Sequence, residues 1–325
     1  MSSAKPALRI SGPGDLLAAV PRLLGFHPEE SLVIIGLADG QLIATARMDL
    51  TDCSKHVEQT VGAMVRGGAT ELVGAVFTAT RAGLDAPLPH TDIVDRLDAA
   101  AKDADVQVRD CLLVSNGRRW SYTCTSAGCC PPEGTILPSG PGVFEADATV
   151  LGMTVAPNRA ALRERFTKLP DTITPLLSPE LEAPLGFTVG ELLGAAAKAE
   201  RPGKATFPSD EDAARFAVAL TRYPVRDALW LAIDEEAIKG GELWLDLARR
   251  LPSPYDAPAL FLYAWGTWRQ GDGTVAGMAA QLAVESDPKY SAADLLLVAL
   301  AQGVDPRRMP KLHLPRSVTE EANHE

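Results

Sequence analysis

A short, unbroken apolar run near the start of the chain constrains the fold most. Residues 31–37 read Ser-Leu-Val-Ile-Ile-Gly-Leu, a β-branched stretch that suits a strand buried on both faces. Asp39-Gly40 follows and precedes a second strand-like run, residues 41–49. An Asp-Gly pair between two such runs is a strong hairpin signal. We therefore expect the sheet to begin with an antiparallel pair.

Helix-like and strand-like segments alternate after this hairpin. Their ranges are 53–66 (helix), 71–80 (strand), 90–103 (helix) and 106–115 (strand). This alternation predicts right-handed parallel crossovers. Asn116-Gly117 then predicts a second hairpin, with a return strand over 118–124. We expect residues 1–168 to form a mixed α/β domain with a parallel core and antiparallel hairpins beside it.

The second half of the chain has a different pattern. Residues 169–208 are rich in Pro, Leu and Ala and are expected to form an irregular linker, whereas helical patterns dominate residues 209–310. One stretch has the spacing of the second half of a tetratricopeptide repeat, with Gly271-Asp-Gly followed by Asp287-Pro288. Only this one repeat matches. We expect an all-α, tetratricopeptide-like helical domain, followed by a flexible tail over 311–325.

Charge and hydropathy exclude several classes of protein. The chain has 42 acidic and 31 basic residues, a net charge of -11, and no Lys/Arg run longer than two, which disfavours nucleic-acid binding. No apolar run approaches the roughly 18 residues of a membrane helix, and we find no secretory signal. We expect a cytoplasmic protein with reduced thiols and no membrane association.

Three of the five cysteines lie close together, and Cys129-Cys130 run directly into Pro-Pro-Glu133-Gly134. Structural zinc needs four ligands, usually with Cys-x-x-Cys spacing, and that spacing is missing here. Adjacent cysteines are also expected to project in different directions. We therefore keep zinc binding by Cys124, Cys129 and Cys130 as an alternative, and expect a site without metal.

Two other interpretations of this segment stay open. Arg118 and Arg119 lie on the same predicted hairpin and could lower the pKa of a reactive thiol. The favoured interpretation is that the thiols are inert and packed under a proline-rich loop, because buried cysteine behaves as a small hydrophobe. Arg118 and Glu133 would then stand at the rim of a pocket.

A second candidate is the turn before the first buried strand, Gly-Phe-His27-Pro28-Glu29-Glu30. His27 could act as a general base or ligand, with Glu29 or Glu30 orienting it. The alternative is a purely structural turn in which Pro28 fixes the backbone.

Other positions are candidates by location alone. Arg47 and Asp49 share one face of a strand, where they bind a polar ligand or form a salt bridge. Arg81 follows a predicted parallel strand, at the sheet edge where α/β proteins bind ligands. Trp120 lies on the return strand, where packing is the simpler interpretation. The chain lacks the common phosphate-loop, dinucleotide, zinc-protease and serine-hydrolase motifs.

Two blocks of sequence carry a family resemblance. Residues 13–36, which include Gly-Phe-His-Pro-Glu-Glu-Ser, resemble the opening of domain-of-unknown-function family 4192. The Cys-Cys-Pro-Pro-Glu-Gly core resembles that family's second signature, and the Gly271–Pro288 region resembles its C-terminal part. The resemblance implies that His27, Cys129, Cys130 and Glu133 occupy signature positions. It implies no catalytic role, because the family has no assigned activity.

From these patterns we expect a small-ligand-binding or regulatory protein whose helical domain engages a protein partner. Its ligand would lie between the His27 turn and the loop from Cys124 to Gly134. The alternatives are an enzyme that uses His27 with a nearby carboxylate or thiol, and a purely structural interaction protein. The candidate ligand-binding residues are His27, Glu29, Glu30, Arg47, Asp49, Arg81, Arg118, Trp120, Cys129, Cys130 and Glu133.

Overall fold

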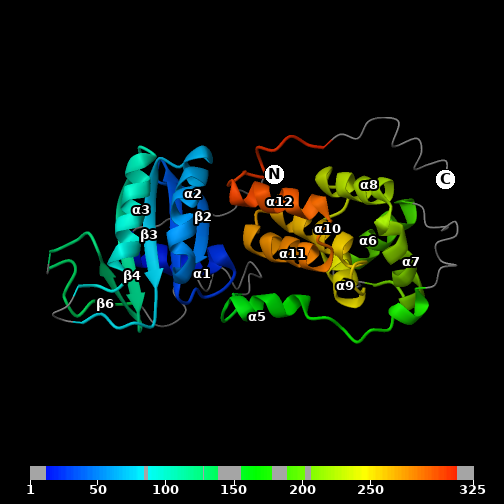
Figure 1. Cartoon of the computed structure of the whole chain (residues 1–325), viewed down its shortest axis with the longest axis horizontal. Coiled ribbons are helices and arrows are strands. Elements are labelled where there is room, and N and C mark those ends of the chain that lie inside the picture. Colours follow the sequence, from blue (N-terminus) through cyan, green and yellow to red (C-terminus); the bar gives the residue numbers. More distant parts are fainter. Residues whose placement is uncertain are drawn as a thin grey trace. The chain divides into compact units, whose positions relative to one another are not determined.

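The computed structural model describes residues 12–83, 87–126, 128–137, 155–177, 189–201 and 206–312 (Figure 1). The chain divides into two compact units, Met1–Leu162 and Arg163–Glu325. The first is a mixed α/β unit and the second is helical, as the sequence predicts. Most of the predicted tail, residues 313–325, lies outside the described residues.

Six strands form one sheet in the order β2-β1-β3-β4-β5-β6. Their bounds are β1 Ser31–Ala38, β2 Gln41–Asp49, β3 Glu71–Phe77, β4 Gln107–Ser115, β5 Arg118–Ser121 and β6 Thr135–Ile136. Both predicted hairpins are confirmed. Their turns place Asp39, Gly40, Asn116 and Gly117 at positive φ, the conformation that a tight two-residue hairpin requires.

The predicted parallel core is wrong in one respect. β1 lies inside the sheet and is antiparallel to both β2 and β3, so β3–β4 is the one parallel pair among the described strands. The crossover from β2 passes β1 and adds β3 to the far side of β1, which leaves β2 at the edge of the sheet. Alternating strands and helices predict that β2 and β3 run in the same direction, which they do, but not that they are neighbours.

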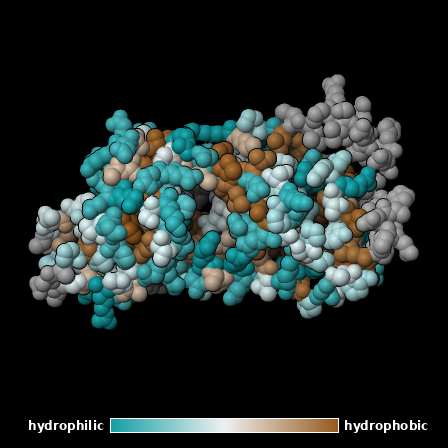
Figure 2. All heavy atoms as spheres, viewed as in Figure 1, coloured by the Kyte–Doolittle hydropathy of each residue, from teal (hydrophilic) through white to brown (hydrophobic). Residues whose placement is uncertain are grey.

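Helices α2 (Cys53–Arg66) and α3 (Thr91–Asp103) supply one side of the core. Val57, Val61 and Leu97 pack with buried residues from β1, β3 and β4. Figure 1 shows both helices running alongside the strands, and Figure 2 shows mainly hydrophilic residues over their outward sides. Their amphipathic patterns therefore predicted the buried side of each helix correctly.

The turn before β1 is fixed by backbone contacts. Helix α1 (Pro13–Leu24) ends at Gly25, whose φ of 77° lies in the left-handed region that glycine favours. Phe26 then forms a parallel bridge with Ala156, and the His27 N–H donates to the Ala156 carbonyl at 3.1 Å. A short helix, α5 (Arg159–Arg163), follows this contact.

In the helical unit, α10 is buried along almost its whole length. Every residue from Ala257 to Gly266 is buried, and the helix contacts α7, α8, α9, α11 and α12. The bounds are α7 Asp210–Thr221, α8 Tyr223–Asp234, α9 Glu242–Arg250, α10 Ala257–Arg269, α11 Gly273–Ser286 and α12 Ser291–Ala301. All six lie within residues 209–310, where the sequence predicts helices. Tetratricopeptide-like packing stays a prediction.

The segment 169–208 is more regular than expected. It contains a 3-10 turn, η3 (Thr174–Leu176), and helix α6 (Val189–Ala199), which buries Leu192, Ala196 and Ala199. No helix in the described part of the chain is long and apolar enough to span a bilayer.

Candidate functional site

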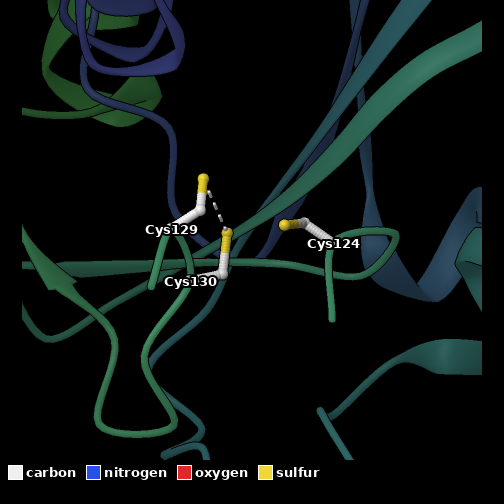
Figure 3. Close-up of side chains that lie close together, drawn as sticks. All are labelled: Cys124, Cys129 and Cys130. Atoms are coloured by element: carbon white, nitrogen blue, oxygen red, sulfur yellow. Dashed lines mark hydrogen bonds between the residues drawn. The ribbon is translucent and has the colours of Figure 1, made fainter. Parts of the chain in front are cut away.

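Three thiols converge in the loop between β5 and β6, the last two strands in the sheet. The Sγ atoms of Cys124, Cys129 and Cys130, here called the thiol cluster, all lie within 4.8 Å of one another (Figure 3). Cys129 is exposed and the other two are half-buried. The Cys130 thiol points to the Cys129 sulfur at 3.8 Å. The cysteines belong to the thiol loop, residues 124–126 and 128–134, which connects β5 to β6.

A backbone turn brings the adjacent cysteines back to Cys124. The Ser126 carbonyl accepts hydrogen bonds from the N–H groups of Cys129 at 3.0 Å and Cys130 at 2.7 Å. Adjacent side chains were expected to point apart. They converge because this turn folds the chain so that both sulfurs face the third.

The start of the thiol loop is anchored to β4. β5 ends at Ser121, three residues before the predicted end, because the Ser121 hydroxyl accepts the N–H groups of Thr123 and Cys124. That hydroxyl donates to the Asp110 carboxylate at 2.7 Å, and the Thr123 hydroxyl donates to the same oxygen at 2.9 Å. Cys124 therefore follows a turn with fixed side-chain contacts.

The end of the thiol loop is held by two side chains of β5. The Arg118 guanidinium donates to the carbonyls of Glu133 and Gly134, at 3.1 and 2.9 Å. The Trp120 indole donates to the Pro132 carbonyl at 2.9 Å. Gly134 has φ of +77°, and a Cβ there would lie 2.4 Å from the indole ring. Arg118 and Trp120, both candidate residues, thus position the loop.

Cys124 and Cys130 differ in acidity. The Ser126 backbone N–H, followed by the Cys130 thiol, donates to the Cys124 sulfur and lowers its pKa. Burial, followed by the neighbouring cysteines, raises the pKa of Cys130 to about 12. The predicted cause of a low pKa, Arg118 with Arg119, is not the operative one. Local hydrogen bonds make Cys124 the thiol that ionises more readily of these two.

The His27 turn contributes a different polar cluster. The Glu30 carboxylate accepts the Thr78 hydroxyl at 3.0 and 3.1 Å and the Ala79 N–H at 2.6 Å. His90 Nε2 lies 3.3 Å from the Thr78 hydroxyl. Glu30 and His90 both have positive φ, which is uncommon for residues other than glycine. Thr78 and His90 were not among the candidates, because single residues after a strand carry no pattern.

Arg47 and Asp49 form a salt bridge of 2.7 Å at the edge of the sheet. The Arg47 side chain is only 12% exposed. It also donates to the Ser31 hydroxyl at 2.7 Å and to the Glu29 carbonyl at 3.3 Å. These contacts hold β2 to the start of β1. Of the two interpretations of Arg47 and Asp49, the geometry therefore matches the salt bridge.

The remaining candidates point into solvent. His27, Glu29, Arg81 and Glu133 are exposed. Among the described residues, the His27 side chain has no hydrogen-bond partner, although its backbone N–H is bonded to Ala156. No described residue orients the His27 imidazole for acid–base chemistry.

Among the described residues, no hydrogen bond or ion pair joins the His27 turn to the thiol cluster. The turn precedes β1 and the thiol loop follows β5, and the sheet order places β3 and β4 between those strands. With about 4.8 Å between neighbouring strands, the backbones of β1 and β5 are roughly 14 Å apart. The described contacts therefore form two separate clusters, one at each of these strands.

Comparison with known proteins identifies the family and no function. No curated protein matches the chain, and no solved structure matches it. A family model described as a domain of unknown function (DUF4192) matches residues 13–307, which include both units and the thiol cluster. The chain therefore belongs to the DUF4192 family of domains of unknown function.

Proposed function

We propose that the protein is a metal-binding regulatory protein whose α/β unit holds one thiophilic metal ion. Cys124, Cys129 and Cys130 supply the ligands. The convergence of their three sulfurs within 4.8 Å carries this proposal. Thiolates are the preferred ligands of soft and borderline ions such as Cu(I) and Zn²⁺.

The sulfur separations suit such an ion. With a Zn–S distance near 2.3 Å, two ligands of a tetrahedral site lie about 3.8 Å apart. Cys129 and Cys130 already have sulfurs 3.8 Å apart. The other separations are at most 4.8 Å, so small rotations of the side chains complete the site.

The anchors at both ends of the thiol loop favour binding. Asp110 holds the first turn through Ser121, and Arg118 with Trp120 holds the last residues. A loop that is ordered before the ion arrives loses less conformational entropy on binding. The ion must still displace the Cys130 proton, and thiolate coordination stabilises the deprotonated form.

The regulatory part of the proposal rests on an open coordination position. In the described part of the chain, the cluster of possible metal ligands contains these three cysteines and no fourth residue. Zinc sites with three protein ligands leave one position for water or an exchangeable ligand. A small ligand would bind there. The role of the helical unit in contacting a partner protein stays a prediction.

A zinc titration tests this proposal. Reduced, metal-free protein should bind about one equivalent of Zn²⁺ in competition with a chromophoric chelator. Cys124→Ser, Cys129→Ser and Cys130→Ser should each weaken binding by about 100-fold or more, since each removes one ligand. Cys53→Ala, which removes a core thiol, is the matched control and should leave the affinity unchanged.

Two results would contradict the proposal. One is binding of less than about half an equivalent to the wild-type protein. The other is unchanged affinity in all three loop variants, which would place the ion elsewhere. Co²⁺ gives an independent readout, because thiolate-to-cobalt charge-transfer absorption should appear in the wild type and weaken in each loop variant.

A further inference from the structure

We propose that the thiol cluster is also an oxidative modification site that takes a hydroperoxide as its substrate. Cys124 is oxidised first, and Cys129 then forms a disulfide with it. The regulatory consequence rests on the proposed function, because the disulfide removes two of the three metal ligands. Oxidation would therefore release the ion.

Cys124 has the contacts of an attacking thiolate. Its sulfur accepts a hydrogen bond from the Ser126 backbone N–H. It lies in a surface loop and is only half-buried. A thiolate that is stabilised locally and reachable by a small oxidant is the usual setting of a redox-active cysteine.

Geometry selects Cys129 as the second thiol. Cys129 and Cys130 are adjacent, so their Cα atoms lie about 3.8 Å apart, below the usual range for disulfides of roughly 4.4–6.8 Å. A bridge between these two is therefore disfavoured. Cys130 is half-buried, and its thiol donates to the Cys129 sulfur at 3.8 Å. Cys129 is exposed, and its sulfur lies within 4.8 Å of Cys124.

The chemistry balances in two steps. The Cys124 thiolate attacks one peroxide oxygen, an S–O bond forms, and the O–O bond breaks to release hydroxide or alkoxide. Sulfur loses two electrons and the peroxide gains them. Deprotonated Cys129 then attacks the sulfenic acid, the S–S bond forms and the S–O bond breaks. The departing hydroxide takes up a proton and leaves as water.

The other two cysteines provide an internal control. Cys53 and Cys111 are fully buried, and burial is the first cause of their raised pKa values, about 11 and about 12. Neither thiol has the exposure that peroxide requires. Oxidation should therefore be confined to the thiol loop in the folded protein.

Peptide mapping of reduced, metal-free protein tests the oxidation directly. One equivalent of hydrogen peroxide should lower the number of titratable thiols by two and give a Cys124–Cys129 disulfide by mass spectrometry. In Cys129→Ser, dimedone should instead trap a sulfenic acid on Cys124. Cys130→Ser keeps a hydrogen-bond donor and should still form the disulfide, as should Cys53→Ala. No disulfide, or a bridge that includes Cys130, would overturn the inference.

A second measurement separates this inference from the proposed function. Zinc-loaded protein should release its zinc to a chromophoric chelator at the rate at which the disulfide forms. If zinc binds but peroxide gives no disulfide, the inference fails and the proposed function stands. If zinc never binds but the disulfide forms, the proposed function and the regulatory consequence fail, and the modification site stands.

Discussion

Two groups of thiols in the same α/β unit have opposite environments. Cys53 and Cys111 are enclosed by the core, and burial raises their pKa values to about 11 and about 12. The thiol cluster lies in a loop, where a backbone N–H lowers the pKa of Cys124. The same side chain is a packing group in one place and, in our proposal, a nucleophile or ligand in the other.

The contrast shows that local backbone geometry, and not the number of cysteines, creates the candidate site. Cys111 is packed so tightly that a Cβ on Gly74 would lie 2.6 Å from its sulfur. In the loop, one carbonyl, that of Ser126, gathers two cysteines against a third. Core packing isolates each buried thiol, whereas the turn brings the exposed thiols together.

Alkylation should give the largest difference between the two groups. At pH 8, pKa values of 11 to 12 leave roughly one core thiol in a thousand or fewer ionised. Iodoacetamide should therefore modify Cys124, whose pKa is lowered, at least about a hundredfold faster than Cys53 and Cys111. Mass spectrometry of timed samples measures both rates, and denatured protein, in which all cysteines react alike, is the control. Equal rates in the folded protein would remove the distinction.

Releasing the end of the thiol loop should have the next largest effect. Gly134→Ala places a Cβ 2.4 Å from Trp120, so the Trp120–Pro132 contact must break. Zinc affinity should fall by about 10- to 100-fold, as for other changes that misplace metal ligands. Gly117→Ala is the matched control, because φ there is also positive, at +73°, with nothing within 4 Å. An equal loss in both variants would show that backbone strain, and not the Trp120 contact, is responsible.

The core thiol Cys111 should make the protein less stable at alkaline pH. Its pKa is about 12 in the folded state and 9.0 ordinarily, so only the unfolded chain releases this proton between those values. The contribution of the protonated Cys111 thiol to the free energy of unfolding is complete below about pH 9 and decreases as the pH rises toward 12. Between pH 8 and 10 the wild type should lose roughly 1 kcal/mol more unfolding free energy than Cys111→Ala.

Urea denaturation of both proteins at each pH measures this difference. Cys111→Ala also loses core packing and is expected to be less stable at pH 7, so the test is the change with pH and not the absolute value. Val61→Ala, a core substitution that removes no titrating group, should follow the wild type in its pH dependence. If the unfolding free energies of wild type and Cys111→Ala changed equally with pH, the ionisation of Cys111 would not differ between the folded and unfolded states.

Loss of Arg118 should give the smallest effect. Arg118→Ala removes two hydrogen bonds to loop carbonyls while the Trp120 contact remains, so zinc affinity should fall by about 3- to 10-fold. Arg109→Ala is the control, since it removes a cation that pairs with Glu71 on neighbouring β3. A loss as large as that of Gly134→Ala would make Arg118 the main anchor.

Local signals predicted much of the fold. Asp39-Gly40 and Asn116-Gly117 marked both hairpins because few other pairs accept two successive positive φ values. The amphipathic helices were predicted because their apolar faces repeat. The inner position of β1 was not predictable in this way, since strand order depends on which edge the next crossover reaches.

The candidate site was predicted as a location and not as an arrangement. The cysteines and Trp120 were candidates because of their residue types. The convergence of the cysteines depends on the backbone carbonyl of Ser126, and a backbone carbonyl is present in every residue, so it gives no signal in the sequence. Thr78 was missed because its partner Glu30 is distant in sequence, and His90 was missed because it joins this cluster through Thr78. Such contacts arise from tertiary structure and leave no local pattern.

β6 has a consequence for how the protein behaves in concentrated solution. This strand is only two residues long and covers the outer edge of β5 through Arg118 and Arg119. An uncovered strand edge offers free N–H and C=O groups to other chains and promotes aggregation. Because the thiol loop leads directly into β6, any change that loosens the loop should also expose β5. Light scattering of the Gly134→Ala protein would then detect self-association that the wild type avoids.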